Sequence, residues 1–386
     1  MTAVVSITRC ADYDRERVQA AIDLALERAG GIGSFARPGD RVLLKPNILL
    51  GAGPEKAVCT HPEVVRAAIR AFRAFGCAVI VAEQPGIGPA EQTKRAVETS
   101  GVFPVCREEG VECRLFRANG FVPVPLPEGK RTKVVHLPRD FQDADHVVSL
   151  AKLKTHMQAT YTGAIKNFYG AIPGRQRKEI HALAKYVAFS EGIVDVFQAV
   201  KPRFGIIDGI VGMDGRGPGS GRPRELGLLL ASADLVALDR VATRAVGWKK
   251  VRVHHIDDAA ARGLGEGDLA KIRVVGERLE DLTVRFVPPP TQFQNPPPFL
   301  FDVFYNLAGI KPAVVRANCT ACGACVAACP TGAITLDAEP KAVIDYAKCV
   351  ECFCCHELCA YGAVTERHGP LARALRRVRK LFRRSE

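Results

Sequence analysis

Short apolar runs alternate with amphipathic stretches along the first 286 residues of the chain. The apolar runs predict strands at residues 3–7, 41–49, 78–84, 112–116, 146–153, 204–210, 226–232 and 272–276. The amphipathic stretches predict helices over 15–28, 62–75, 91–100, 182–200 and 235–246. This alternation predicts an α/β body with a mostly parallel sheet and helices on both faces. The strands are nearly all apolar, as is typical of parallel strands buried on both sides.

The pattern stops at residues 287–299, VPPPTQFQNPPPF, which contain six prolines. Proline lacks the amide hydrogen that helices and sheets need, so we expect an extended, semi-rigid connector here. The sequence therefore predicts a body over residues 1–286, a proline-rich linker over 287–312, a cysteine-rich domain over 313–366 and a tail over 367–386.

The cysteine-rich domain contains an internal repeat with a period of 30 residues. CTACGACVAACPTGAIT (Cys319–Thr335) aligns with CVECFCCHELCAYGAVT (Cys349–Thr365). Nine of the 14 cysteines lie between Cys319 and Cys359, and every cysteine of the first copy has a counterpart in the second. Such a dense cluster in a long chain indicates metal binding rather than disulfides.

Each copy of the repeat has the spacing C-x2-C-x2-C-x3-C. Three thiolates of such a run reach one iron–sulfur cubane, and the fourth points at the other cubane. We therefore predict that one 4Fe–4S cluster binds Cys319, Cys322, Cys325 and Cys359, and that a second binds Cys349, Cys352, Cys355 and Cys329. The motif resembles bacterial two-cluster ferredoxins over about 50 residues. The resemblance implies a small α+β ferredoxin-like domain that transfers electrons.

Zinc is the competing ligand, but structural zinc sites usually show separated C-x2-C pairs. The second copy departs from the ferredoxin pattern at Ala360, where the first copy has Pro330, and at the extra Cys354. We interpret Cys354 as a packed spectator, with a role as an alternative ligand left open. The five cysteines in the first 113 residues are expected to be small buried hydrophobic side chains.

Three pairs of segments stand out in the body: LLKPN with THPEVVRAAI, LAKLKTH with TGAIKNFYG, and IIDGIVGMDGRGPGSG with ASADLVALD. They resemble the DUF362 family, a domain of no established general activity that often occurs beside ferredoxin modules. The resemblance spans most of residues 3–275. It implies a fold and leaves the chemistry open.

Polar side chains in these segments come where strands end. Ligands of open α/β sheets sit at the carboxyl ends of strands, so Lys45 could hold an anion and Asn47 could orient it. Lys154 and His156 share one strand face, and Lys166 with Asn167 follows ten residues later. These six residues predict a site for a carboxylate or phosphate, with His156 as a general acid. The alternative is an ordinary basic surface at the strand ends.

The glycine-rich segment Met213–Gly221 follows a predicted strand, and a further strand comes after it. It does not fit G-x-G-x-x-G, so a dinucleotide site is disfavoured. A flexible flap, an anion-binding backbone nest helped by Arg216, Arg222 and Arg224, or a plain surface loop remain open.

The formal net charge is +13, and the last 20 residues contribute +7 of it through eight Lys or Arg against one Glu. The tail also has apolar residues at helical spacing, which predicts a basic amphipathic helix. We expect it to dock on the protein itself or to contact an acidic partner or an anionic membrane surface. Nucleic acid is not an expected partner, because no basic stretch is interleaved with stacking aromatics.

Together these features predict a cytoplasmic protein, since the start of the chain lacks a basic region followed by a long apolar stretch. The favoured hypothesis is a ferredoxin-coupled oxidoreductase that acts on an anionic small molecule bound by the α/β domain. The alternative is a non-catalytic electron carrier whose α/β domain docks a redox partner protein. Whether a flavin or another cofactor joins the two clusters is open.

Overall fold

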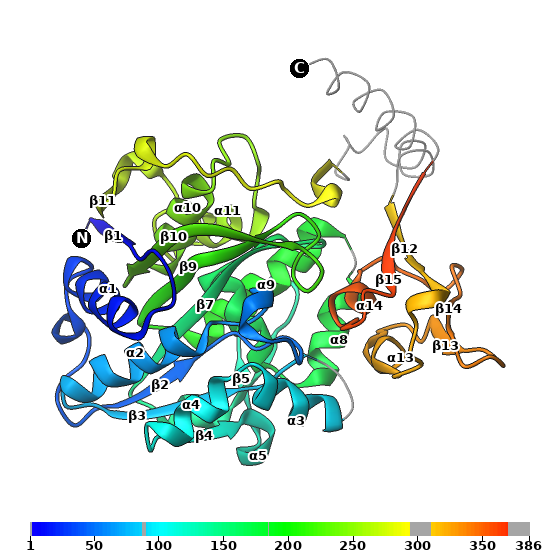
Figure 1. Ribbon diagram of the computed structural model, residues 1–386, viewed down its shortest axis with the longest axis horizontal. Helices are drawn as coiled ribbons and strands as arrows, with labels where there is room; N and C mark the ends of the chain where they lie inside the picture. The colour runs from blue at the N-terminus through cyan, green and yellow to red at the C-terminus, as the bar shows by residue number, and fades with distance from the viewer. Residues whose placement is uncertain (1, 87–89, 184, 294–309, 370–386) are drawn as a thin grey trace.

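The computed structural model describes residues 2–86, 90–183, 185–293 and 310–369. Figure 1 shows a large α/β body, coloured blue to yellow, and a small C-terminal domain beside it, coloured orange to red. The body contains a nine-stranded sheet. Its strands are β1 (Ala3–Arg9), β2 (Arg41–Lys45), β3 (Ala78–Glu83), β4 (Glu112–Leu115), β7 (His146–His156), β8 (Thr160–Thr162), β9 (Phe204–Asp214), β10 (Arg222–Ser232) and β11 (Ile272–Gly276).

The strands follow the order β11-β1-β10-β9-β7-β2-β3-β4, and β8 pairs with β7. Five of the strand pairs are parallel, as the sequence predicts. The exceptions are β10, which runs antiparallel to both of its neighbours, and the short β8. Because β2 and β7 are parallel, their carboxyl ends point to the same edge of the sheet. Lys45, the last residue of β2, lies opposite Ser149, and β7 continues from there to His156.

Helices cover both faces of the sheet, which confirms the prediction. The helices of the body are α1 (Arg15–Arg28), α2 (Pro62–Ala74), α3 (Ala90–Thr99), α4 (Val102–Glu108), α5 (Phe116–Asn119), α6 (Arg139–Asp143), α7 (Ala164–Asn167), α8 (Gly174–Ala182), α9 (Tyr186–Val200), α10 (Leu235–Ala245) and α11 (His254–Ala261). Side chains alternate between the faces of a strand. Val42 and Leu44 therefore pack into one apolar core with α1 and α2, whereas Leu43 packs into the other core with α9 and α10.

The ends of several helices follow local capping rules. The carboxylate of Asp14 accepts a hydrogen bond from the Arg17 amide and caps α1, and Pro62 occupies the first turn of α2. Asp234 caps α10 in the same way as Asp14. The sequence pattern missed α4, α8 and α11, and also the hairpin of β5 (Phe121–Pro125) and β6 (Val134–Pro138).

The small domain consists of two short antiparallel sheets and two short helices. Its elements are β12 (Ile310–Val314), α13 (Ala324–Ala328), β13 (Ile334–Leu336), β14 (Ala342–Ile344), α14 (Cys354–Glu357) and β15 (Val364–His368). Because β12 pairs with β15, the domain already includes residue 310, three residues before the predicted boundary. In Figure 1, α14 lies on the side toward the body, and β13 and β14 lie on the far side.

The expected linker contains one turn of 3-10 helix at Pro290–Phe293, although we predicted that its prolines exclude helix. Proline is tolerated at the first position of a helix, where its missing amide is not needed. Residues 294–309 and most of the expected tail helix, 370–386, lie outside the described residues.

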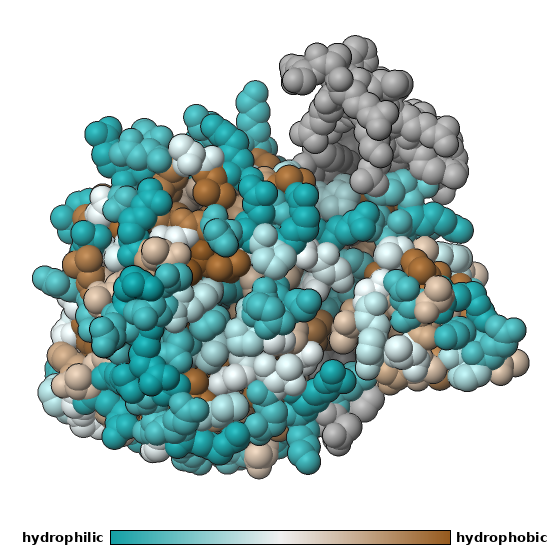
Figure 2. Space-filling view, in the orientation of Figure 1, coloured by the Kyte–Doolittle hydropathy of each residue, from teal (hydrophilic) through white to brown (hydrophobic). Residues whose placement is uncertain are grey.

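The surface in view is hydrophilic over much of the body, and its apolar side chains are scattered (Figure 2). None of the helices in the described ranges has both the length and the apolar character needed to cross a membrane. Four of the five cysteines outside the repeat are buried, as expected, and Cys113 is half-buried.

Candidate functional site

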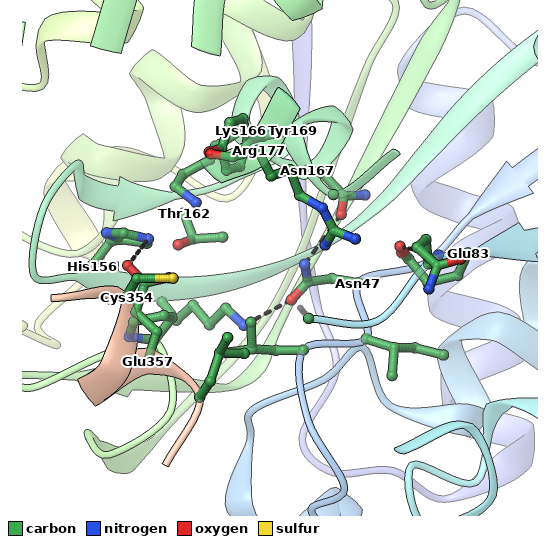
Figure 3. A pocket seen from close by; sticks show the side chains of 18 of the residues that line it. Asn47, Glu83, His156, Thr162, Lys166, Asn167, Tyr169, Arg177, Cys354 and Glu357 are labelled. Carbon is green, nitrogen blue, oxygen red and sulfur yellow. Dashed lines mark hydrogen bonds and ion pairs between the residues drawn. The ribbon is translucent and has the colours of Figure 1, made fainter. Parts of the chain in front are cut away.

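A pocket lies at the junction between the α/β body and the small domain (Figure 3). It has about 600 Å³ of empty volume, part of which is open to solvent. The loop after β2, the end of β7, and α7 with α8 form the body side of the pocket, and Cys354, Glu357 and Leu358 form the other side. Figure 3 shows Cys354 and Glu357 on the ribbon of the small domain, close to His156 of the body.

Three cationic side chains line this pocket: Lys154, Lys166 and Arg177. Lys154 Nζ donates to Asn47 Oδ1 at 2.7 Å and to the backbone oxygen of Val58 at 2.5 Å. Burial lowers the pKa of Lys154 to about 7 and the pKa of Lys166 to about 8. Glu357 is the only carboxylate of the described pocket wall besides Glu83, which pairs with Lys45. The excess of positive charge suits an anion.

Lys45 lies beneath the pocket and does not belong to its wall. Its Nζ donates to Glu83 Oε2 at 2.6 Å and to Asn167 Oδ1 at 3.3 Å, and both partners are buried. Asn167 Oδ1 also accepts from Asn47 Nδ2 at 3.2 Å. The expected direct contact of Lys45 with an anion is therefore not what the structure shows, because an internal carboxylate already balances its charge. Lys45 instead positions Asn167, which lines the pocket.

His156 lies where the two domains meet. Its Nδ1 accepts hydrogen bonds from the backbone amides of Gln158 and Ala159 at 3.1 and 3.0 Å. In a neutral ring the hydrogen is therefore on Nε2, which lies 2.9 Å from Glu357 Oε1. Burial moves the pKa of His156 well below its usual value. The neutral imidazole therefore holds its hydrogen on Nε2 beside the Glu357 carboxylate, and both residues line the pocket.

Two buried polar atoms of the pocket wall have no hydrogen-bond partner among the described residues. They are Thr162 Oγ1 and Arg177 Nε, whereas His156 Nε2 and Glu357 Oε1 face each other at 2.9 Å. Buried polar groups nearly always find a partner, so unsatisfied groups that face one pocket indicate a place for a ligand. Five of the six residues predicted from the sequence as an anion site line the pocket, and only Lys45 does not: the five are Asn47, Lys154, His156, Lys166 and Asn167.

The cysteines of the repeat gather around two further cavities, and each cavity contains thiols from both copies. The outer cavity is lined by Cys319, Cys322, Cys325 and Cys359. The inner cavity is lined by Cys329, Cys349, Cys352 and Cys355, and also by Cys354. These are the two sets that the spacing predicts, and four thiols are the ligand set of a cubane. The residues therefore fit iron–sulfur clusters, with Cys354 at the edge of the inner set.

Backbone amides point at several of these sulfur atoms. Ala333 donates to Cys329 Sγ at 3.2 Å, and Ala363 donates to Cys359 Sγ at 3.2 Å. Such hydrogen bonds favour the thiolate and tune the potential of a bound cluster. Burial raises the pKa of Cys352 to about 12, and a bound iron would supply the positive charge that favours the thiolate of this residue.

Cys354 lines both the inner cavity and the junction pocket. Its side chain is buried, and burial raises the pKa of its thiol well above the usual value. Among the described residues, the outer cavity shares no lining residue with the junction pocket. The wall between the junction pocket and the predicted inner cluster is therefore thin and contains a neutral thiol.

The glycine-rich segment forms the turn between β9 and β10 and packs against the small domain. A Cβ atom at Gly219 would come within 2.7 Å of the backbone oxygen of Glu357. Arg216 pairs with Glu366 of β15 at 2.6 Å, and Arg222 pairs with Asp214 at 3.3 Å. These arginines are thus engaged with carboxylates, which does not match the nest for an anion, and the segment supports the junction instead.

Sequence reasoning missed the pocket residues Arg177 and Glu357. Arg177 lies on α8, where no helix was predicted, and its Nη1 donates to the backbone oxygen of Pro85 at 3.1 Å. Glu357 lies inside the second cysteine run. A comparison of the two copies could have found it, because Cys354, Glu357 and Leu358 occupy positions that are all alanine in the first copy.

Two family models match separate parts of the chain. Residues 42–244 match a domain of unknown function, DUF362, and residues 318–363 match a 4Fe–4S dicluster domain. The chain is 36% identical over 245 residues to the thylakoid-associated protein sll1697 of Synechocystis. The aligned part is 63% of this chain and 74% of that relative.

Two solved structures show a distant likeness at 12% sequence identity. One is a crystal structure of a protein from Thermotoga maritima, with a TM-score of 0.35, over 56% of this chain and 54% of that chain. The other is the lactate racemase apoprotein of Thermoanaerobacterium thermosaccharolyticum, with a TM-score of 0.39, over 60% of this chain and 54% of that chain. The chain thus spans about half the length of either structure. The sequence matches show that the chain belongs to the DUF362 family and carries a C-terminal iron–sulfur domain of the 4Fe–4S ferredoxin type.

Proposed function

We propose that the protein is an iron–sulfur electron-transfer protein that works as a ferredoxin-coupled oxidoreductase. In this proposal the ferredoxin-type domain holds two 4Fe–4S clusters, and the α/β domain binds an anionic small molecule in the junction pocket. The reduced clusters supply electrons one at a time. The observation that carries the proposal is the position of Cys354, which lines both the inner cavity and the cationic pocket.

The residues of the chain support distinct parts of this activity. Lys154, Lys166 and Arg177 place positive charge where a carboxylate or phosphate can bind. Closing the small domain over the pocket removes water from around these charges, which strengthens their attraction for an anion. His156 Nε2 faces the same space and can deliver a proton to a reduced product.

The cofactor content is the first test. Protein prepared without oxygen should contain about eight iron and about eight sulfide per chain, as expected for two 4Fe–4S clusters. A value near four would show that one cavity holds no cluster. Bound zinc in place of iron would refute the redox role. Absorbance beyond the iron–sulfur bands would reveal a further chromophore such as a flavin.

The second test measures electron transfer to a small molecule. Dithionite-reduced protein is mixed anaerobically with carboxylate- and phosphate-bearing metabolites, and reoxidation is followed by the visible absorbance of the clusters. The double variant Lys154→Ala, His156→Ala should keep its iron and lose reoxidation. Arg175→Ala is the matched control, because Arg175 lies on α8 beside Arg177 but its side chain is 92% exposed.

Clusters that are reduced reversibly, but that no anion reoxidises, would favour the alternative function. The protein would then be an electron carrier whose α/β domain docks a redox partner. The location in the cytoplasm stays a prediction. So does a peripheral contact of the basic tail with an anionic membrane or an acidic partner, although the name of the Synechocystis relative includes an association with thylakoids.

A further inference from the structure

Lys166, a half-buried residue of α7, differs from Lys45 and Lys152, two buried lysines of the sheet. Lys45 pairs with Glu83 at 2.6 Å, and Lys152 pairs with Asp208 at 2.8 Å. Lys166 has no carboxylate within ion-pair distance among the residues that the structure describes, although it lines the pocket. The fold thus balances the charges of Lys45 and Lys152. Lys154 also has no carboxylate partner, but its amine is held by Asn47 Oδ1 and the Val58 backbone oxygen, whereas no such hydrogen bond is found for the Lys166 amine among the described residues.

Two aromatic rings lie close to the Lys166 amine, and one of them, Tyr169, also lines the pocket. Its Nζ lies 5.1 Å from the ring centre of Tyr169 and 5.8 Å from that of Phe189. In Figure 3, Lys166 and Tyr169 lie together and the amine points toward Thr162. Burial lowers the pKa of Lys166 to about 8. A desolvated lysine beside other cations is the environment in which amines become nucleophiles.

The same pocket offers groups that could hold and activate a carbonyl compound with a negative charge. Arg177 and Lys154 can bind a carboxylate, and the hydroxyl of Thr162 is buried without a hydrogen-bond partner. His156 carries a hydrogen on Nε2 when it is neutral and lines the pocket as well. The pocket wall thus contains an amine (Lys166), two cations that can bind a carboxylate, and a histidine that can carry a proton.

We propose that Lys166 is a nucleophile that forms an imine with the carbonyl group of a 2-oxo acid. The carboxylate of the 2-oxo acid binds Arg177 and Lys154. The amine nitrogen of Lys166 forms a bond to the carbonyl carbon, and the carbonyl oxygen leaves as water with the two amine hydrogens. No oxidant or reductant takes part in this step. The inference rests on the anion pocket of the proposed function and names its substrate class.

The test traps the imine in the oxidised holoprotein, with pyruvate as the probe and cyanoborohydride as the trapping reagent. Peptide mapping by mass spectrometry locates the secondary amine that forms. At pH 8 the neutral fraction of an amine with a pKa of about 8 exceeds that of an ordinary exposed lysine by about a hundredfold. Modification of Lys166 should therefore be faster than that of the exposed Lys348 by a similar factor.

Two controls separate a specific site from general reactivity. Lys166→Arg keeps the positive charge and should lose the rapid adduct while it retains its iron. Acetone has a carbonyl but no carboxylate, and it should modify Lys166 at least about tenfold more slowly than pyruvate, since it lacks the ion pair to Arg177.

The proposal is overturned if pyruvate leaves Lys166 unmodified, or if it modifies Lys166 and the exposed lysines at equal rates. Wild-type mapping alone decides this point, so a variant that fails to fold does not obscure it. The experiment contains no electron donor for the clusters. Failure of the imine therefore leaves the proposed electron transfer standing, and failure of reoxidation leaves the imine standing.

Discussion

The outer and inner cavities of the small domain arise from two copies of one motif but have different surroundings. In the outer cavity, Cys322 is exposed, and among the described residues this cavity shares no lining residue with the junction pocket. In the inner cavity, Cys352 and Cys355 are buried, and Cys354 connects the cavity to the pocket. The same ligand spacing thus produces one group of thiols near solvent and another near the anion pocket.

The two copies differ in the side chains that their short helices present, and only the second copy packs against the pocket. The first copy has alanine at 324, 327 and 328, which are small side chains on α13. The second copy has Cys354, Glu357 and Leu358 at these positions, and all three line the junction pocket. We therefore expect the outer cluster to accept electrons from a partner and the inner cluster to exchange them with the bound anion.

The largest expected effect comes from removing one ligand of either cavity. Cys352→Ser and Cys322→Ser should each lose about four of about eight iron atoms, because each damages one cubane. Only Cys352→Ser should abolish reoxidation by the anion that oxidises the wild type, since dithionite can still reduce the inner cluster in Cys322→Ser. EPR spectra and stopped-flow absorbance measure both effects. Equal loss of reoxidation in the two variants would contradict the expectation that only the inner cluster exchanges electrons with the bound anion.

A smaller effect is expected from a methyl group at the domain junction. Gly219→Ala places a carbon 2.7 Å from the Glu357 backbone oxygen and should lower the free energy of unfolding by about 1–3 kcal/mol. It should also change the EPR signal of the inner cluster more than that of the outer one. Anaerobic denaturant titration measures the stability. Gly174→Ala is the control, because no atom lies within 4 Å of a Cβ there. A Gly219→Ala protein with the free energy of unfolding of the wild type would show that the junction can accommodate the added methyl group.

The smallest effect is the pH dependence of anion binding, probed with sulfate, whose charge is constant over this range. Burial lowers the pKa of Lys154 to about 7, so its positive charge is present below pH 7 and is lost above it. Lys166 loses its charge near pH 8, while Glu357 and neutral His156 face the same space. If sulfate binds only when one lysine is protonated, its affinity should fall about tenfold for each pH unit above the pKa of that lysine.

Sulfate binding is read from the EPR signals of the two clusters. The inner signal should change with sulfate below pH 7, and the outer signal should stay constant. An affinity that does not vary between pH 6 and pH 9 would mean that Lys154 keeps its proton in the bound state and in the free state alike.

Much of the fold could be predicted because strands and helices leave local periodic signals. The predicted helix over residues 15–28 matches α1, and the apolar runs found all the main strands of the body. The apolar pattern did not predict α8, GRQRKEIHA, because this helix is mostly polar although Arg177 and Gln176 are buried. Its apolar periodicity is weak because three of its four buried side chains, Gln176, Arg177 and His181, are polar.

The sequence by itself determined the ligand chemistry and the strand face that carries Lys154 and His156. Thiol spacing along a tight loop and the period of two in a strand are local properties of a chain. Only the tertiary structure decided that Lys45 is neutralised by Glu83, that Arg177 and Glu357 complete the pocket, and that the second cysteine copy faces it. The reason is physical, because the burial and the partner of a charge depend on which distant elements pack together.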